Sequence, residues 1–374
     1  MVELEKILIL GGGIGGMCAA IALARDGYSV EICEAQSELT AQGSGLTLMG
    51  PALRALHDLG VWEKVRETGN FAYGSRILDF HGNLIIERSG IKPQGLDLPT
   101  AGGILRPVLH DILKGCLLEL GVKLRVGISG ECSQQTDSNV EVRFTNGVVD
   151  RYNLVIAANG LMSHTRLGLW PEAPVPTFTG QGCWRLIADR PESIDRPTFY
   201  VGAPVTVGAI PCSQTHMYVW VLQHVPNNPW VDPKTQNALL KDLLVPFGGE
   251  IAHVRNTIGE DSCVNYRPLE AYLMPPPWHK GRILLLGDAA HGATPHLASG
   301  AGMAMEDAIV LAESLRTEKT ISSALEAHTK RRFPRCKLVV ENSLAIGIAE
   351  MNGDPATTLN EIMTRSHKAL SEKY

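Results

Sequence analysis

The sequence lacks three features that would place it in a specialised class of proteins. Its 374 residues contain no run of about twenty apolar residues, so no transmembrane helix is expected. The formal net charge is only −5, which gives no reason to expect a nucleic acid or an anionic membrane as a partner. The N-terminus has no basic segment of the kind that begins a signal peptide. We therefore expect a cytoplasmic protein.

The cysteines lack the spacing of a metal or redox motif. Eight are present, but no Cys-x-x-Cys pair occurs and several fall within apolar strand or helix patterns. Scattered cysteines of this kind are typical of small core residues in a reducing compartment. Neither a disulfide nor a metal site is expected.

A glycine-rich turn near the N-terminus predicts a dinucleotide site. The apolar run Lys6–Leu10 is typical of a buried parallel strand, and the Ala-rich segment Met17–Ala24 is typical of a helix. Between them, Gly11–Gly16 has the Gly-x-Gly-x-x-Gly spacing that lets a pyrophosphate approach backbone amides. A second apolar strand ends at Glu34, whose carboxylate can bind a ribose diol and repels a 2′-phosphate. The predicted ligand is FAD or NAD, not NADP.

A second glycine-rich signal, Gly287–His291, lies near the end of the chain. It follows the apolar strand Arg282–Leu286 and precedes a helix pattern over Gly302–Leu315, which contains Glu306 and Asp307. Either signal alone is weak. Together they predict one bound dinucleotide, with its adenosine half at the N-terminal turn and its other half at this one.

The remaining pattern predicts an α/β protein built from two units. Between about residues 180 and 268, β-rich segments with Pro and Gly punctuation replace the alternation of helices and strands. A hairpin is also predicted over residues 77–86. We predict a discontinuous Rossmann-type FAD-binding domain (1–71, 99–179 and 269–320), an inserted and mostly antiparallel β-sheet substrate domain (72–98 and 180–268), and C-terminal helices (321–374).

The C-terminal segment is predicted to be helical, with an interruption at Pro334. Three arginines, Arg331, Arg332 and Arg335, cluster there. We expect them to form a solvated face or to pair with another domain, not to bind a nucleotide.

This order of motifs resembles the single-component (class A) FAD-dependent aromatic hydroxylases, whose fold is that of p-hydroxybenzoate hydroxylase. The resemblance covers essentially the whole chain. It rests on the ADP-binding fingerprint Gly11–Gly16 with Glu34, and on the flavin–ribityl motif Gly287–His291 followed by Gly300–Gly302. It implies that Asp288 binds the ribityl chain and that the helix start at Gly300 lies near the flavin pyrimidine. Because no Cys or His is marked for a bond to the flavin, FAD is expected to bind without a covalent link.

A third family signature departs from its usual form. The family motif begins with Asp-Gly and continues to a Ser and an Arg, whereas this chain has Asn159, Gly160, Ser163 and Arg166. The motif is linked to both FAD and NAD(P)H binding, and an amide loses the charge of the acid. We expect an altered nicotinamide interaction and no loss of FAD.

The resemblance also matches Arg106 to an arginine that reaches the FAD pyrophosphate region. The residues expected to hold the cofactor are Gly11, Gly13, Ile14, Gly15, Gly16, Glu34, Ala35, Gly45, Arg106, Asn159, Gly160, Asp288, Gly300, Ala301, Gly302 and Met303.

The implied activity is that of an FAD-dependent monooxygenase. It would hydroxylate a small aromatic or heteroaromatic substrate with NAD(P)H and O2 through a C4a-hydroperoxyflavin. The cofactor carries the oxidation, while the protein stabilises charge with a helix N-terminus, excludes water and holds the substrate ring. The expected partners are the small substrate and O2, and a homodimer is left open.

Substrate contacts are less clearly marked. Arg185 is expected either to bind a substrate carboxylate or to sit in a salt bridge. Tyr218 and Trp220 share one face of a strand, as pocket lining or as core. His296 is the candidate titrating group above the flavin, and Thr47 lines the pocket or is an ordinary strand residue. The candidate catalytic residues are His296, Arg185, Tyr218, Thr47 and Pro295.

Three other functions occur with such a fold or could arise from it, and the sequence argues against the last of them, halogenation. One is an FAD-dependent reductase or dehydrogenase that does not insert oxygen. Another is a flavin-binding protein without turnover, which Asn159 favours. Flavin-dependent halogenases carry a Trp-x-Trp-x-Ile-Pro stretch, and Gly208–Pro211 lacks those tryptophans.

Overall fold

A six-stranded sheet forms the centre of one half of the molecule. The computed structural model describes residues 2, 4–40 and 44–374. The strand order is β18 (His279–Lys280), β19 (Ile283–Leu285), β12 (Leu154–Ala157), β1 (Ile7–Leu10), β2 (Val30–Glu34) and β8 (Lys123–Val126). All pairs except β18–β19 are parallel. The central strands β1 and β12 are buried along their whole length, which explains their continuous apolar sequences.

Helices cover this parallel sheet, as a Rossmann-type unit requires. The principal ones are α1 (Ile14–Arg25), α4 (Arg106–Glu119) and α8 (Gly300–Thr317). Helix α1 packs against both α4 and α8. The predicted order of strand, glycine turn and helix at the N-terminus is therefore confirmed.

The second large sheet has eight strands and is mostly antiparallel. Its order is β20 (His291–Gly292), β17 (Asn265–Leu273), β13 (Thr177–Asp189), β16 (His216–His224), β15 (Thr206–Pro211), β14 (Thr198–Val201), β5 (Gly74–Asp79) and β6 (Leu84–Ser89). Only β14 and β5 pair in parallel. The predicted hairpin is confirmed as β5–β6. The two segments predicted to form the substrate domain, residues 72–98 and 180–268, thus contribute strands to the same sheet. The exact domain boundaries remain a prediction.

Two short helices in this region were missed by the sequence analysis. They are α6 (Gln236–Leu243) and α7 (Gly249–Thr257), and their apolar side chains join a core cluster with one face of the eight-stranded sheet. Each has only eight or nine residues, too few to give a clear helical periodicity.

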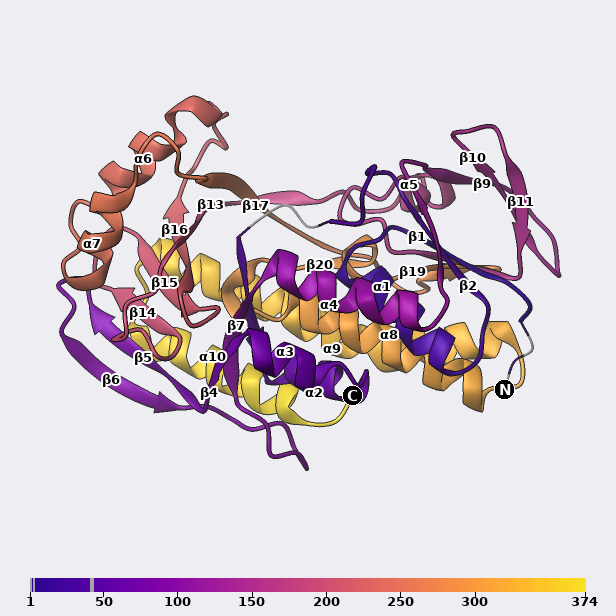
Figure 1. Ribbon diagram of the computed structural model, residues 1–374, viewed down its shortest axis with the longest axis horizontal. Coiled ribbons are helices and arrows are strands. Elements are labelled where there is room, and N and C mark those ends of the chain that lie inside the picture. Colours follow the sequence, from indigo (N-terminus) through magenta and orange to yellow (C-terminus); the bar gives the residue numbers. More distant parts are fainter. Residues whose placement is uncertain (1, 3, 41–43) are drawn as a thin grey trace.

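Smaller elements complete the fold. They are β3 (Gly45–Met49), β4 (Asn70–Ala72) and β7 (Ala101–Leu105) in one sheet, β9 (Gly130–Gln135), β10 (Val140–Phe144) and β11 (Val149–Tyr152) in another, the helices α2 (Gly50–Asp58), α3 (Trp62–Thr68) and α5 (His164–Leu169), and the single turns η1 (Pro233–Thr235), η2 (Gly287–Ala289) and η3 (Pro295–Leu297). Figure 1 shows α6 and α7 at one end of the long axis and the β9–β11 sheet at the other, with α8 and α9 along the middle.

The C-terminal region consists of two helices, α9 (Ile321–Asn352) and α10 (Ala356–Ser371). The predicted interruption at Pro334 was wrong, because α9 continues through it. Packing of α9 against both α8 and α10 keeps the helix continuous despite the missing amide donor. Gly353, at φ 70°, turns the chain between the two helices. Among the described residues, no helix is both long enough and apolar enough to cross a membrane.

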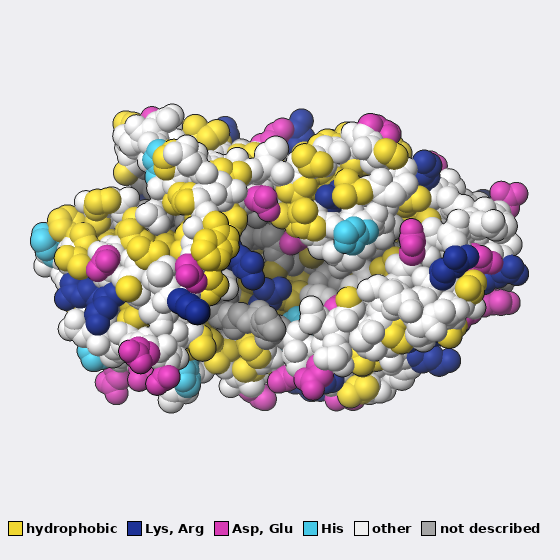
Figure 2. All heavy atoms as spheres, turned by 90° about the horizontal axis from the view of Figure 1, so that it is seen from above, with side chains coloured by type: hydrophobic (Ala, Val, Ile, Leu, Met, Phe, Trp, Pro, Cys, Tyr) yellow, Lys and Arg dark blue, Asp and Glu magenta, His cyan; other side chains and the backbone are white. Residues whose placement is uncertain are grey.

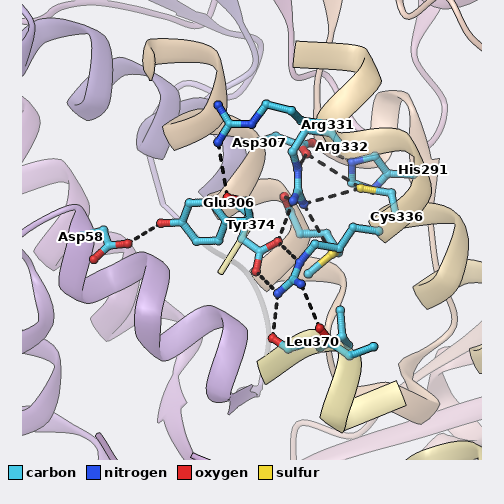
Figure 3. Close-up of polar contacts among 12 residues, drawn as sticks. Asp58, His291, Glu306, Asp307, Arg331, Arg332, Cys336, Leu370 and Tyr374 are labelled. Atoms are coloured by element: carbon cyan, nitrogen blue, oxygen red, sulfur yellow. Dashed lines mark hydrogen bonds and ion pairs between the residues drawn. The ribbon is translucent and has the colours of Figure 1, made fainter. Parts of the chain in front are cut away.

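Two adjacent carboxylates in α8, Glu306 and Asp307, are fully buried and bind α9 (Figure 3). Arg332 donates to Asp307 and to Glu306, each at 2.7 Å. Arg335 donates to both oxygens of Glu306, at 2.7 and 2.9 Å, and to the carbonyl of Leu370 at 2.7 Å. Of the two alternatives expected for the arginine cluster, pairing with another part of the molecule holds for Arg332 and Arg335. The solvated alternative is wrong for Arg332, which is fully buried.

The second oxygen of Asp307 holds the turn that carries Asp288. It accepts hydrogen bonds from the backbone N–H of Gly287 (3.0 Å) and from Nε2 of His291 (2.6 Å). Burial alone would raise the pKa of Asp307, but the positive charges of His291 and Arg332 lower it well below its usual value. Asp307 therefore links the C-terminal helices to the Gly287–His291 turn.

The depressed pKa of Asp307 predicts a loss of stability in acid. A carboxylate whose pKa is lower in the folded than in the unfolded state stabilises the fold above its unfolded pKa, near 3.9, and this contribution falls as the pH drops below that value. Urea unfolding of wild type and Asp307→Asn should show a large difference in unfolding free energy at pH 7. That difference should shrink between pH 5 and pH 3. A difference that is independent of pH would mean that Asp307 is not charged in the folded protein.

Candidate functional site

One large cavity lies between the parallel sheet, the eight-stranded sheet and the C-terminal helices. Its volume is about 1240 Å³, and residues from both glycine motifs line it. Figure 2 looks into this hollow, which opens near the middle of the face shown, with Lys or Arg side chains on its wall. We call it the main cavity.

The N-terminal glycine turn forms one end of the main cavity. Gly11 has φ 109°, and a Cβ there would lie 2.4 Å from the carbonyl oxygen of Ala158, so this position requires glycine. Gly13 precedes α1 and has no capping side chain, which leaves the first amides of α1 facing the cavity. The Glu34 carboxylate accepts the N–H of Gly12 at 2.7 Å. The turn can therefore bind a phosphate, with an acid close by.

The second motif lies close to the first, because a Cβ at Gly15 and one at Gly287 would each lie 3.1 Å from the Cβ of Ala304. Gly287 has φ 63°, and this left-handed residue starts the turn from which Asp288 lines the cavity. Asp288 is open to the cavity, but the protein that encloses it raises its pKa by desolvation, and the charges of His291 and Arg106 partly offset this effect. Within the described part of the chain, its carboxylate has no hydrogen-bond partner, so it is available to a ligand hydroxyl.

Asn159 lies beside this site, and only one end of its side-chain amide forms a hydrogen bond within the described structure. Its Nδ2 donates to Oγ1 of Thr165 at 3.0 Å, whereas its Oδ1 is buried without a partner among the described atoms. The neighbouring Arg166 is fully buried, donates to the carbonyls of Leu161 and Ala289, and lies 4.1 Å from the ring centre of Tyr272.

The shape of the main cavity fits a dinucleotide. Gly13, Gly160 and Gly300 all line it, and a Cβ at any of the three would have no atom within 4 Å. Three segments of the chain that are distant in sequence thus present bare backbone to the cavity. Together with the unpartnered Asp288 carboxylate, they form a cradle in which an extended cofactor can contact backbone atoms.

Arginines and aromatic rings line the part of the cavity against the eight-stranded sheet. Residues at alternate positions point into it: Cys183, Arg185 and Ile187 on β13, Tyr218, Trp220 and Leu222 on β16, and Asn265 and Arg267 on β17. Neither Arg185 nor Arg267 forms an ion pair within the described residues. Burial opposes the charge of Arg185, but Cys183 and Tyr218 nearby raise its pKa above the usual value. This wall can bind an anion.

Thr47 lines the cavity from β3, which packs directly against β16. Tyr218 lines it from β16, and β3 runs so close to β16 that a Cβ at Gly45 would lie 2.3 Å from the Cβ of Tyr218. Burial raises the pKa of Tyr218 strongly, with Cys183 adding to the effect and Arg185 opposing it, so its phenol stays protonated at neutral pH.

His296 lies at the edge of the cavity under the C-terminal helices. Its Nδ1 is 2.9 Å from Oγ1 of Thr294, and its Nε2 is 3.4 Å from a carboxylate oxygen of Glu350 on α9. Gly347 makes room for the ring, because a Cβ there would lie 2.9 Å from Cε1 of His296. The His296 side chain is only 1% exposed, so it is held in place between η3 and α9.

The main cavity brings together most of the predicted site residues. Those that line it are Gly13, Ile14, Gly15, Gly45, Thr47, Arg106, Gly160, Arg185, Tyr218, Asp288, Pro295, His296, Gly300 and Ala301. Those that do not are Gly11, Gly16, Glu34, Ala35, Asn159, Gly302 and Met303. Gly16 packs on the carbonyl of Gly11, Gly302 packs on Ala52, and Met303 is fully buried.

Several lining residues were missed by sequence reasoning. They are Ile346 and Glu350 on α9, Met363 and His367 on α10, Phe199 on β14, and Cys263, Asn265 and Arg267 on or beside β17. No motif marks them, because they reach the cavity only through the packing of the C-terminal helices and the sheet. Cys263 also corrects the expectation that the cysteines are core residues, since it is exposed in the cavity wall.

Comparison with known proteins identifies relatives over the full length of the chain. Residues 5–343 match the model of the FAD binding domain family. The chain is 33% identical over 99% of its length to the whole of a Bacillus subtilis (strain 168) protein named "Putative FAD-dependent monooxygenase YetM". It is 31% identical over 82% of its length to 79% of the 2-heptyl-3-hydroxy-4(1H)-quinolone synthase of Pseudomonas aeruginosa (strain UCBPP-PA14).

A solved structure shares the fold. The Klebsiella pneumoniae HpxO structure complexed with FAD and uric acid has a TM-score of 0.82 and 23% identity, and the match covers 98% of this chain and 92% of that one.

The N-terminal turn offers a matched pair of variants. Gly11→Ala should lower the unfolding free energy by roughly 1–3 kcal/mol, because its φ and its contact with Ala158 exclude a side chain. Gly13→Ala should lower stability without FAD by at most about 1 kcal/mol, since its φ is −70° and its Cβ meets open space, and only the less favourable N-cap residue counts against it. It should nevertheless weaken FAD binding, measured by fluorescence titration. Equal FAD affinity in Gly13→Ala and wild type would remove this turn from the cofactor site.

Proposed function

This chain belongs to the FAD binding domain family of flavoprotein monooxygenases, and we propose that it hydroxylates a small, anionic aromatic or heteroaromatic molecule with NAD(P)H and O2. We infer an anionic, aromatic substrate from two arginines, Arg185 and Arg267, which line the main cavity next to aromatic side chains.

The main cavity can hold both a flavin and a substrate. Bound FAD supplies the redox chemistry, by accepting electrons from NAD(P)H and activating O2. Gly13 and the start of α1 would hold the pyrophosphate, and Asp288 the ribityl chain. Glu34 does not line the main cavity but accepts the N–H of Gly12 beside it, and is proposed to bind the ribose there. The amides at the start of α8, near Gly300, would stabilise negative charge on the flavin ring.

The protein's own residues hold and orient the aromatic substrate. Arg185 and Arg267 would bind its negative charge, and a guanidinium can do so with two parallel hydrogen bonds. The rings of Phe199 and Trp220, with centres 5.9 Å apart, would pack against the substrate ring. The protonated hydroxyl of Tyr218 would donate a hydrogen bond to a substrate oxygen. This enclosure keeps bulk water from the reacting atoms.

His296 is the proposed base near the substrate. Its Nδ1 is held by Thr294, so Nε2, which lies 3.4 Å from a Glu350 carboxylate oxygen and has no hydrogen bond among the described atoms, is the nitrogen that a substrate hydroxyl would have to reach. Removing a proton from a ring hydroxyl makes the ring richer in electrons and easier to hydroxylate.

The cellular setting and assembly are also proposed. All eight cysteines are free thiols, which supports a reducing compartment such as the cytoplasm. A homodimer is proposed as the assembly, and size-exclusion chromatography with light scattering would test it.

The arginine wall leads to a direct test. Arg185→Gln should raise the apparent KM of the aromatic acid or phenol that most stimulates NADH oxidation by roughly 10- to 100-fold, as expected for the loss of about 1.5–3 kcal/mol. It should also increase the fraction of NADH that ends as hydrogen peroxide, because a misplaced ring is not hydroxylated. Arg196→Gln, which removes an arginine of the same half that lines neither the cavity nor the glycine turns, is the control. Unchanged KM and coupling in Arg185→Gln would reject the anion-binding role, and flavin turnover without oxygenated product for any compound would favour a reductase.

Asn159 offers a test of nicotinamide use. Asn159→Asp restores the acid of the family motif at a position whose Oδ1 has no partner in the described structure. We expect faster flavin reduction at a given NAD(P)H concentration, followed by stopped-flow absorbance, and nearly unchanged FAD affinity. Slower reduction would show instead that the amide is adapted to this protein's site.

A further inference from the structure

A second, smaller cavity lies on the opposite face of the eight-stranded sheet. We call it the rear cavity. Its volume is about 380 Å³, within the range of small-molecule sites. The sheet provides one wall, and α6 with the segment that precedes η1 provides the other. Its lining residues are Trp184, Gln223, Val225, Pro229, Val231, Leu239, Asp242, Leu243 and Tyr266.

The two cavities are placed back to back by the alternation of side chains along the strands. On β13, Cys183 and Arg185 line the main cavity, and Trp184 between them lines the rear one. On β17, Asn265 and Arg267 flank Tyr266 in the same way. Because successive side chains of a strand point to opposite faces, only one layer of backbone separates the two cavities here.

The rear cavity contains polar groups that the protein itself leaves without partners. Tyr266 is 7% exposed, and its hydroxyl is buried without a hydrogen bond in the described structure. The carboxylate of Asp242, on α6, likewise has no hydrogen-bond or ion-pair partner among the described residues. Gln223 accepts the indole N–H of Trp184 at 2.8 Å, which fixes that ring in the wall.

The rear cavity favours a positively charged ligand, whereas the arginine-lined wall of the main cavity favours a negatively charged one. Trp184 and Tyr266, with ring centres 4.7 Å apart, offer aromatic surface. Among the described residues, Asp242 is the only charged one that lines the rear cavity. The main cavity is lined by three arginines, Arg106, Arg185 and Arg267, and by the carboxylates of Asp288 and Glu350, and its wall on the eight-stranded sheet carries arginines alone. An aromatic ring with a cationic nitrogen fits these features, because the rings can pack against it and the Asp242 carboxylate can accept its N–H groups.

We propose that the rear cavity binds a small aromatic amine and that its occupancy alters the main cavity through the shared strands. A ligand that shifts the backbone at Trp184 or Tyr266 would also shift Arg185 and Arg267, which are their neighbours on the same strands. Such a coupling would let an amine change how firmly the arginines hold their anion, without contact between the two ligands.

The binding test compares two probes of similar size and opposite charge on the FAD-loaded protein. Tryptamine should bind by isothermal titration calorimetry at least about tenfold more tightly than indole-3-acetate. Asp242→Asn should reduce this preference to less than about threefold, because it removes the only charge among the described lining residues. The residue is exposed, so the change does not disturb the core. Glu172→Gln, which removes an exposed carboxylate that lines neither cavity, should retain it. Equal affinity for the two probes, or a preference that survives in Asp242→Asn, would overturn the proposal.

A second variant tests the place of binding. Leu243→Trp fills the cavity and should abolish tryptamine binding while keeping the FAD spectrum and the circular dichroism of wild type. If Leu243→Trp does not fold, Leu239→Trp at the more exposed rim serves the same purpose, since Leu239 is 40% exposed. Wild-type tryptamine affinity in a folded filled variant would place the binding elsewhere and reject the site.

Coupling is measured on NADH oxidation stimulated by an aromatic acid. Saturating tryptamine should change the apparent KM for that acid at least about threefold in wild type and have no effect in the filled variant. An unchanged KM in wild type would reject the coupling. The calorimetric titration does not depend on catalysis. If the proposed hydroxylation is wrong, no hydroxylated product will form, but tryptamine will still bind to the rear cavity.

Discussion

The carboxylate of Asp307 holds together the parts of the molecule that meet at the main cavity. One of its oxygens binds Arg332 of α9, and the other binds Gly287 and His291 at the ends of the turn that carries Asp288. Burying a charged group is unfavourable unless the group is paired and fully hydrogen-bonded. Removal of one partner of Asp307 would therefore leave a buried charge uncompensated and destabilise the fold. The position of Asp288 therefore depends on the C-terminal helices, although these lie far from it in the sequence.

The eight-stranded sheet has a comparable influence on the substrate side. Its strands offer arginines and aromatic rings to the main cavity at one set of alternate positions, and Trp184, Gln223 and Tyr266 to the rear cavity at the other. A residue that shapes one cavity is thus a direct neighbour in sequence of a residue that shapes the other. Substitutions chosen to change substrate preference will affect both faces unless they preserve the strand backbone.

Sequence reasoning was strongest where the backbone itself makes the site. The turn at Gly11–Gly16 and the Gly287–His291 motif could be recognised because glycine is required there by positive φ or close packing, as at Gly11 and Gly287. It was weaker where tertiary packing overrides a local preference. Pro334 lies within a continuous α9, and α6 and α7 are too short to show a period. Glu350 and His367 carry no signal, since their helices approach the cavity only in the folded protein.

The sequence by itself determined the two nucleotide motifs, the α/β class and the family, because these depend on local order: apolar strand, glycine turn, helix. It also marked Arg185, Tyr218 and His296 as candidates. Only the tertiary structure decided that Arg267 stands beside Arg185 without an acid partner in the described chain, and that Glu350 faces His296. It also showed that Arg332 is buried against Asp307. Such contacts join segments distant in the chain, and their strength comes from burial, which no local pattern encodes.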